Sequence, residues 1–209
     1  MTQSTDGTPL LWSLDEDPAP IRELLARGGV LAVPTGSTYG LAVDPRLASA
    51  VESVYRIKRR EARKPLPLVV ADRQQAEDLG LDVESEAFAF GARFWPAPLT
   101  MLVPRAAGSV GERLQLGELE EIAVRIPGSN FLRDLLGRVG HGLTATSANL
   151  SGAPAITDPE AVCELLAREA GIEGAVVVGE PLSGAAPSTI VAWREGRPQV
   201  LRQGRFTLH

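Results

Sequence analysis

The sequence predicts an α/β fold: a single domain with a twisted, mixed β-sheet and flanking helices. Short apolar runs alternate with segments of helical periodicity along the 209 residues, which indicates a central sheet with helices packed on it. The last part of the chain is rich in strand-like segments, which adds antiparallel members to that sheet. No linker or internal repeat interrupts the pattern. We therefore expect one domain over 13–205, preceded by a loose polar segment, 1–12.

Helical and strand-like segments alternate through the first half of the chain. A helix is expected to begin at Pro20, because proline suits the first turn, and to stop at Gly28 and Gly29. The apolar run 30–33 is bounded by glycine and proline and predicts a buried strand, which the loop 34–40 follows. The other elements expected here are a helix over 46–60, a strand over 66–70, helices over 73–79 and 83–94, and a strand over 99–103.

The second half repeats the alternation after a surface excursion expected over 108–117. A strand over 143–146 runs into the loop 147–152. Asp158 is expected to cap a helix that ends near residue 170, with Pro159 at its first position. The other elements expected are a strand over 122–126, a helix around 131–136, and closing strands over 176–178, 189–193 and 199–202.

Composition limits the classes of protein that fit. The net charge of −5 argues against a protein whose whole surface serves nucleic acid, because such domains are usually basic. Cys163 is the only cysteine, so an internal disulfide is impossible and a reducing compartment is expected. Residues 1–7 lack the apolar run of a signal peptide, and no apolar stretch is long enough to span a membrane. We expect a cytoplasmic protein.

Familiar catalytic and metal-binding schemes are not expected. The chain has two histidines, His141 and His209, so we expect neither a catalytic triad nor a histidine-rich metal site. Cys163 falls in a helical pattern beside Val162 and Leu165, so a structural role is expected.

A basic cluster occupies residues 56–64, where a predicted helix ends and a loop begins. Cations at a helix C-terminus are favoured by the helix dipole, but two or three would satisfy that preference. Converging lysines and arginines are also what a triphosphate or a nucleic-acid backbone requires. Both interpretations stay open. The cations are Arg56, Lys58, Arg59, Arg60, Arg63 and Lys64.

Two loops that follow predicted strands are rich in hydroxyl and amide side chains. Loops at the carboxyl ends of strands are the usual place for ligands in α/β proteins. The loop 34–40 is not a Walker loop, because no lysine follows its second glycine. It is not a nucleophile elbow, because Thr38 occupies the position of the nucleophilic serine in that motif. In the second loop, Ser147 and Asn149 could hold phosphate oxygens or a purine edge. Local capping of their own backbone is the alternative.

Eight short stretches occur in the order typical of one known family. They are PTGSTYGL at 34–41, KRR at 58–60, KPL at 64–66, FWPAPLT at 94–100, AVRIP at 123–127, SAN at 147–149, PSTIV at 187–191 and LRQG at 201–204. Together they resemble the YrdC-like family, the threonylcarbamoyl-AMP synthases, over about 19–204. The chain resembles the short form, without an extra C-terminal domain.

The resemblance implies a fold and a reaction. The fold is a twisted mixed sheet around a concave, positively charged cleft. The reaction takes ATP, L-threonine and bicarbonate to threonylcarbamoyl-AMP and pyrophosphate, with Mg²⁺ bound to the ATP. A separate transferase complex then moves the threonylcarbamoyl group to tRNA, so a tRNA contact is a possible further interaction.

The resemblance also implies roles for individual residues. Lys58 and Arg60 are assigned to the ATP phosphates and to catalysis, with Ser147 and Asn149 beside them and Arg202 on the nucleotide. We expect the first four to gather around the phosphates. The residues assigned to threonine are Thr35, Thr38, Tyr39, Arg125, Ala145 and Ser188.

Some positions depart from the family pattern. Gly36 replaces an acidic residue, Glu61 a proline, Ala97 a glycine and Ala192 an aspartate, while the family's Lys, Arg, Ser and Asn are all present. The main alternative function is an RNA-binding module of the same fold without synthase activity. A carbamoyl-transferring or hydrolytic enzyme on this fold is a second alternative.

Overall fold

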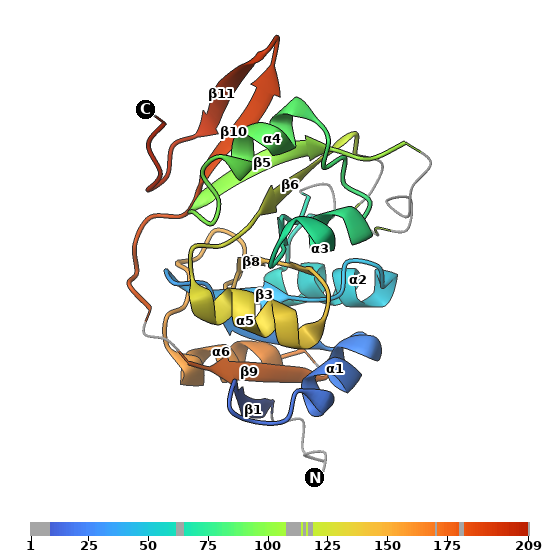
Figure 1. Cartoon of the computed structure of the whole chain (residues 1–209). Helices are drawn as coiled ribbons and strands as arrows, with labels where there is room; N and C mark the ends of the chain where they lie inside the picture. The colour runs from blue at the N-terminus through green and yellow to red at the C-terminus, as the bar shows by residue number, and fades with distance from the viewer. Residues whose placement is uncertain are drawn as a thin grey trace. The chain divides into compact units, whose positions relative to one another are not determined.

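The strands of the described residues form two mixed sheets, and each sheet lies mainly in one of two compact units. Unit 1 consists of Met1–Lys64 and Thr144–Gly184, and unit 2 of Pro65–Leu143 and Ala185–His209. The structure is a computed structural model that describes residues 9–61, 65–107, 114, 116, 119–169, 171–179 and 182–208. The predicted α/β class with mixed strand directions and flanking helices is confirmed (Figure 1). The strands divide between two sheets, however, where one central sheet was expected.

The sheet of unit 1 has five strands. Their order is β1 (Leu10–Ser13), β9 (Gly174–Val178), β2 (Val30–Pro34), β3 (Tyr39–Ala42) and β8 (Thr146–Ser147). The first three strands are parallel, and β3 and β8 add antiparallel pairs. Every residue of β2 is buried, as expected for a strand with parallel and antiparallel neighbours inside a sheet.

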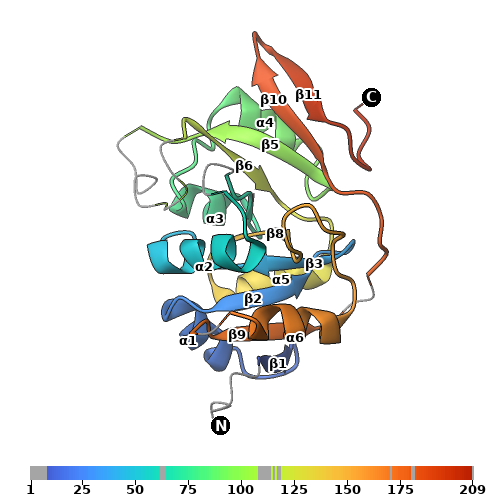
Figure 2. The ribbon, with the colours of Figure 1, turned by 180° about the vertical axis from the view of Figure 1, so that it is seen from behind.

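Three helices flank this sheet. They are α1 (Ala19–Ala26), α2 (Ala48–Lys58) and α6 (Pro159–Ala167). α1 and α2 pack against β2, and α6 packs against β9, as Figure 2 shows for α6. Ile21, Leu24 and Leu25 recur at helical spacing and form the buried side of α1. The predicted cap of α6 is confirmed, because the Asp158 carboxylate accepts hydrogen bonds from the first turn.

The sheet of unit 2 has six strands. Their order is β11 (Arg197–Arg202), β10 (Thr189–Arg194), β5 (Leu99–Pro104), β6 (Glu121–Arg125), β4 (Leu68–Val69) and β7 (Leu143–Thr144). β10 is parallel to β5, while β10–β11 and β5–β6 are antiparallel pairs. α4 (Glu86–Ala92) packs on β5 and β10, and α3 (Arg73–Asp78) and α5 (Asn130–Val139) are the other helices.

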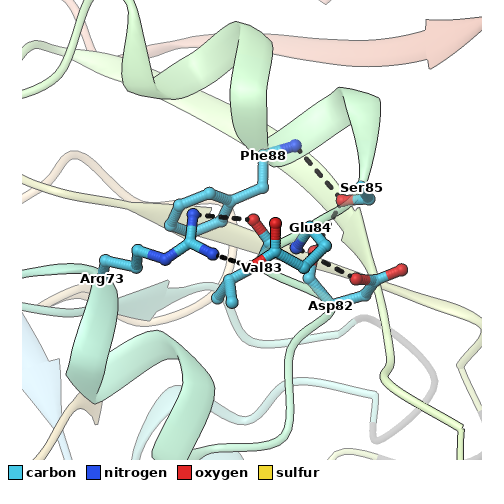
Figure 3. Close-up of polar contacts among 6 residues, drawn as sticks. All are labelled: Arg73, Asp82, Val83, Glu84, Ser85 and Phe88. Atoms are coloured by element: carbon cyan, nitrogen blue, oxygen red, sulfur yellow. Dashed lines mark hydrogen bonds and ion pairs between the residues drawn. The ribbon is translucent and has the colours of Figure 1, made fainter.

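Arg73 of α3 contacts the turn that precedes α4. Figure 3 shows Arg73 reaching the turn before α4, where its guanidinium donates to the Val83 carbonyl at 3.1 Å and pairs with the Glu84 carboxylate. The Ser85 hydroxyl caps α4 by accepting from the Phe88 amide at 3.3 Å. The cap and the arginine together fix where α4 begins.

Three predicted segments differ from the structure, and a fourth lies largely outside the described residues. β1 lies within the segment 1–12 that was expected to be loose, and β3 begins inside the predicted loop 34–40. The strand expected over 143–146 is divided at Ala145, because β7 joins one sheet and β8 the other. The excursion expected over 108–117 lies largely outside the described residues, although Leu114 and Leu116 are described and buried.

None of the helices in the described part of the chain has the length and hydrophobicity needed to cross a bilayer.

Candidate functional site

The basic cluster begins in the last turn of α2. Arg59 adopts a left-handed conformation, with φ 48°, and its N–H and that of Arg60 bond to the carbonyls of Arg56 and Tyr55. This reversal closes the helix in the way that usually requires glycine or asparagine. Lys58 is therefore the last helical residue, and Arg60 leaves in a new direction. Arg63 and Lys64 of the predicted cluster lie outside the described residues.

Lys58 is a buried cation that binds the segment carrying Ser147 and Asn149. Its ammonium group donates to the Asn149 side-chain oxygen at 2.7 Å, to the Asn149 carbonyl at 3.1 Å and to the Ser147 carbonyl. An ammonium has three N–H donors, so all of them are used. Burial, followed by the positive charge of Arg60, lowers the pKa of Lys58 to about 8.

The segment 147–149 is itself a small hydrogen-bonded network. The Ser147 hydroxyl donates to the Asn149 side-chain oxygen at 2.7 Å, and the Asn149 amide donates to the Ala153 carbonyl at 2.5 Å. The Ala148 amide bonds to the Tyr39 carbonyl at 2.8 Å, which anchors the segment to β3. These bonds agree with the capping alternative, and they also fix the positions of a hydroxyl and an amide at the end of a strand.

Arg60 joins the same network. One terminal nitrogen of its guanidinium donates to the Thr146 hydroxyl at 3.3 Å. The structure therefore brings together Lys58, Arg60, Ser147 and Asn149 within unit 1, from segments about ninety residues apart in sequence. Thr146 was not singled out from the sequence, although it lies in the strand predicted over 143–146, just before the loop 147–152.

The loop after β2 is tied to a distant segment of unit 1. The Thr35 hydroxyl donates to the Thr38 carbonyl at 2.8 Å, so this side chain closes its own loop. The Ser183 hydroxyl donates to the Gly36 carbonyl at 2.8 Å, and the Gly184 amide bonds to the Ser37 carbonyl at 2.9 Å. Gly36 has a φ of 83°, which explains why glycine is suitable where the family has an acidic residue. Nothing in the sequence pointed to Ser183.

Two of the residues assigned to threonine have little to offer a ligand through their side chains. Tyr39 is buried, and its hydroxyl donates to the Val177 carbonyl of β9 at 3.5 Å. Burial, with smaller contributions from Cys163 and Asp158, raises the pKa of Tyr39. Ala145 is half-buried between β7 and β8 and has an apolar side chain. Their assignment to threonine stays a prediction.

Ser188 is held from two sides within unit 2. Its hydroxyl lies 2.8 Å from that of Thr100, a buried residue of β5. Its carbonyl accepts a hydrogen bond from the Arg202 guanidinium at 2.8 Å. Thr100 belongs to the stretch 94–100 that carried the resemblance, but sequence alone did not indicate this contact.

Arg125 completes a group of cations in unit 2. Burial, followed by the charges of Arg205 and Arg202, lowers the pKa of Arg125 to about 10. Burial also lowers the pKa of Arg202. A set of cations in one unit attracts phosphate or carboxylate. The predicted site residues thus fall into two sets, one in each unit. The concave basic cleft stays a prediction.

Carboxylate, histidine and cysteine side chains do not gather into a metal centre in the described ranges, where no group of three or more was found.

Comparison with known proteins gives a family and several relatives. The family model described as Telomere recombination, the Sua5/YciO/YrdC model, matches residues 23–204. Threonylcarbamoyl-AMP synthase of Bacillus subtilis is 34% identical over 203 residues, covering 97% of this chain and 57% of that protein. Its namesake from Pyrococcus abyssi is 33% identical over 184 residues, covering 88% and 53%. The chain spans about half the length of the curated relatives it matches.

Solved structures agree with this result. The crystal structure of P. abyssi Sua5 complexed with L-threonine matches with a TM-score of 0.75 and 29% identity, covering 93% of this chain and 57% of that one. E. coli YciO matches with a TM-score of 0.75 and 23% identity, covering 98% and 97%, which shows the fold alone. Since the family model extends over most of the chain and includes segments of both units, this protein belongs to the Sua5/YciO/YrdC family.

Proposed function

We propose that this protein is an L-threonylcarbamoyladenylate synthase, a nucleotidyltransferase. In the reaction, the amine of threonine and bicarbonate form a carbamate with loss of water. A carbamate oxygen then attacks the α-phosphorus of ATP, and the bond to pyrophosphate breaks. The products are threonylcarbamoyl-AMP, pyrophosphate and water.

The observation that carries the proposal is the network around Lys58. An anion attacks a polyanion in this reaction, so catalysis depends on positioning and on positive charge. Lys58 and Arg60 supply two cations beside a hydroxyl and an amide, and their ends are fixed by hydrogen bonds to Asn149 and Thr146. We assign Arg60, Ser147 and Asn149 to the phosphates. Lys58 contributes its charge and holds the segment 147–149.

Three further residues with proposed ligands lie in unit 2. Arg125 and Ser188 are proposed to bind the polar groups of threonine, and Arg202 the nucleotide. Arg125 suits a carboxylate because a guanidinium presents two parallel donors to it. The relative from P. abyssi that was crystallised with L-threonine supports the choice of amino acid. Thr35 and Thr38 are proposed to border the threonine.

Several parts of the proposal concern other molecules. Mg²⁺ is proposed to arrive with ATP, held by phosphate oxygens and water, as is usual for nucleotide substrates. The product is proposed to pass to a separate transferase complex that acts on tRNA in the cytoplasm. A direct contact with tRNA is a further element of the same proposal.

The test is to identify the adenylate that the pure protein makes. The protein is incubated with MgATP, bicarbonate and each amino acid in turn, and products are identified by mass spectrometry. We expect pyrophosphate release and threonylcarbamoyl-AMP only when threonine and bicarbonate are both present. Release with other amino acids, or none with threonine, would refute the proposal.

Assays on the same purified protein distinguish the two alternative functions. An RNA-binding module would make no adenylate and would bind RNA with an affinity that falls steeply as salt rises. A carbamoyl-transferring or hydrolytic enzyme would yield a product of different mass. A matched reaction without bicarbonate controls for simple amino-acid adenylation.

A further inference from the structure

We propose that Thr189 is a positioning residue. Its hydroxyl binds the C-terminal segment, residues 203–206, against the backbone of Ser188. This contact holds Ser188 and Arg202 in place for their ligands. This inference deepens the proposed function and rests on it, since it concerns the reaction assigned to the same residues. Thr189 lies next to Ser188 in sequence, yet no role was expected for it.

The Thr189 hydroxyl uses its entire bonding capacity on the C-terminal segment. It donates to the Phe206 carbonyl at 2.6 Å and accepts from the amides of Gly204 at 3.0 Å and Phe206 at 3.2 Å. A hydroxyl has one donor and two acceptor positions, so none is left over. The side chain is fully buried, so no water can replace a lost bond without rearrangement.

The backbone of Thr189 is fixed independently by β5. Its amide bonds to the Pro98 carbonyl at 3.0 Å, and its Cα is in register with that of Leu99. The hydroxyl therefore projects from a rigid strand, and the C-terminal segment is the part that it holds.

The C-terminal segment lies directly against the residues before Thr189. The Arg205 amide bonds to the Pro187 carbonyl at 3.0 Å. A Cβ added to Gly204 would be 2.2 Å from that carbonyl oxygen and 2.6 Å from that of Ser188, so only glycine permits this approach. The segment is thus in contact with the backbone of Ser188.

Two residues with proposed ligands lie beside this contact. The Arg202 guanidinium, one residue before the segment, donates to the Ser188 carbonyl, and the Ser188 hydroxyl meets that of Thr100. Arg205, within the segment, adds to the positive charge around Arg125. If the segment is released, we expect both Ser188 and Arg202 to lose their fixed positions, and a displacement of about 1 Å can cost about 100-fold in rate.

Two substitutions disturb the contact from opposite sides. Thr189→Val removes the hydroxyl and keeps the shape, while Gly204→Ala inserts a methyl group between the segment and Pro187. Thr189→Ser keeps the hydroxyl and is the conservative rescue. Ser85→Ala is the matched stability control, because it removes a capping hydroxyl in the same unit from a residue with no proposed ligand.

The experiment measures amide exchange by NMR and affinities for MgATP and L-threonine by calorimetry. We expect Thr189→Val to speed exchange of the Gly204 and Phe206 amides and to weaken binding of each ligand by about tenfold or more. Gly204→Ala should do the same, and Thr189→Ser should retain both properties. Ser85→Ala should lower the melting temperature and leave both affinities unchanged.

Opposite outcomes identify what has failed. If Thr189→Val lowers stability as Ser85→Ala does but keeps wild-type affinities, Thr189 is merely structural and the inference is wrong. A wild-type protein that binds both ligands but forms no adenylate would contradict the proposed function alone, and the affinities of the variants would still decide the inference. A wild-type protein that binds neither ligand would overturn both.

Discussion

At the scale of single residues, Lys58 combines a charge with three directed bonds. Lys58→Ala removes the positive charge and leaves the oxygens of Ser147 and Asn149 without their donor. We expect turnover to fall by about 100-fold or more, the loss seen when a group that stabilises the transition state is removed. Steady-state pyrophosphate release measures it. Lys58→Arg keeps the charge but not the compact geometry, so partial activity is expected. A Lys58→Ala protein with near-normal turnover would remove Lys58 from this role.

The lowered pKa of Lys58 predicts a pH dependence. Above about pH 8 the folded protein loses this proton, while the unfolded chain keeps it up to about 10.5, so this residue makes the free energy of unfolding rise with pH over that window. Affinity for MgATP should move the other way and weaken by about tenfold between pH 7 and 9, as the charged form disappears.

Calorimetry at several pH values checks this dependence. Lys58→Arg is the control, because arginine stays charged throughout the range and its affinity profile should be flat there. Identical profiles for the wild-type protein and Lys58→Arg would show that another group titrates.

The sequence indicated which residues lie close together, but not which atoms form the hydrogen bonds between them. The order of short motifs pointed to Lys58, Arg60, Ser147 and Asn149, and unit 1 brings these four together. It could not reveal that Lys58 binds carbonyl oxygens, because backbone groups carry no residue-specific signal. Nor could it reveal the partners of Thr189, which lie 15 and 17 residues away across a turn of the chain.

At the scale of elements, β3 depends on one glycine. Gly40 is paired with β2 on one side and with Ser147 of β8 on the other. A Cβ there would lie 2.9 Å from the Thr35 methyl group and 3.4 Å from the Thr146 carbonyl oxygen. Gly40→Ala should therefore displace Thr35, lower the free energy of unfolding by about 1–3 kcal/mol and raise the KM for threonine more than that for ATP.

Chemical denaturation and steady-state kinetics check both parts. Gly137→Ala is the control, because Gly137 lies within α5 with nothing near its added methyl group, and alanine there should stabilise by about 0.5–1 kcal/mol. An unchanged KM for threonine in Gly40→Ala would show that the loop 34–40 has no part in binding the amino acid.

Elements with strong local signals were predicted well. α6 begins after its Asp158 cap and α1 ends before Gly28, because caps and glycines act within a few residues. β7 and β8 have two residues each and belong to different sheets, which the short stretch 143–146 does not encode. The strands that β7 and β8 pair with, β4 and β3, lie far away in sequence.

At the scale of the whole molecule, neither unit is continuous in sequence. Unit 1 is completed only by residues after 143, and unit 2 only by residues after 184. Folding of unit 1 brings its two segments together, which closes the intervening segment of unit 2 into a loop. Loop closure reduces the entropy that unit 2 must lose on folding. The connectivity alone therefore couples the stabilities of the two units.

This coupling can be measured with one substitution in the core of unit 1. Leu25→Ala removes a fully buried side chain of α1 and should lower the stability of unit 1 by about 2–5 kcal/mol. Hydrogen exchange followed peptide by peptide should show faster exchange in β2 and β9, with a smaller acceleration in β5 of unit 2. Leu135→Ala, at a buried position of α5, is the reciprocal control and should act first on β5. If Leu25→Ala left exchange in β5 unchanged, the units would unfold independently, and the shared loop would contribute nothing to stability.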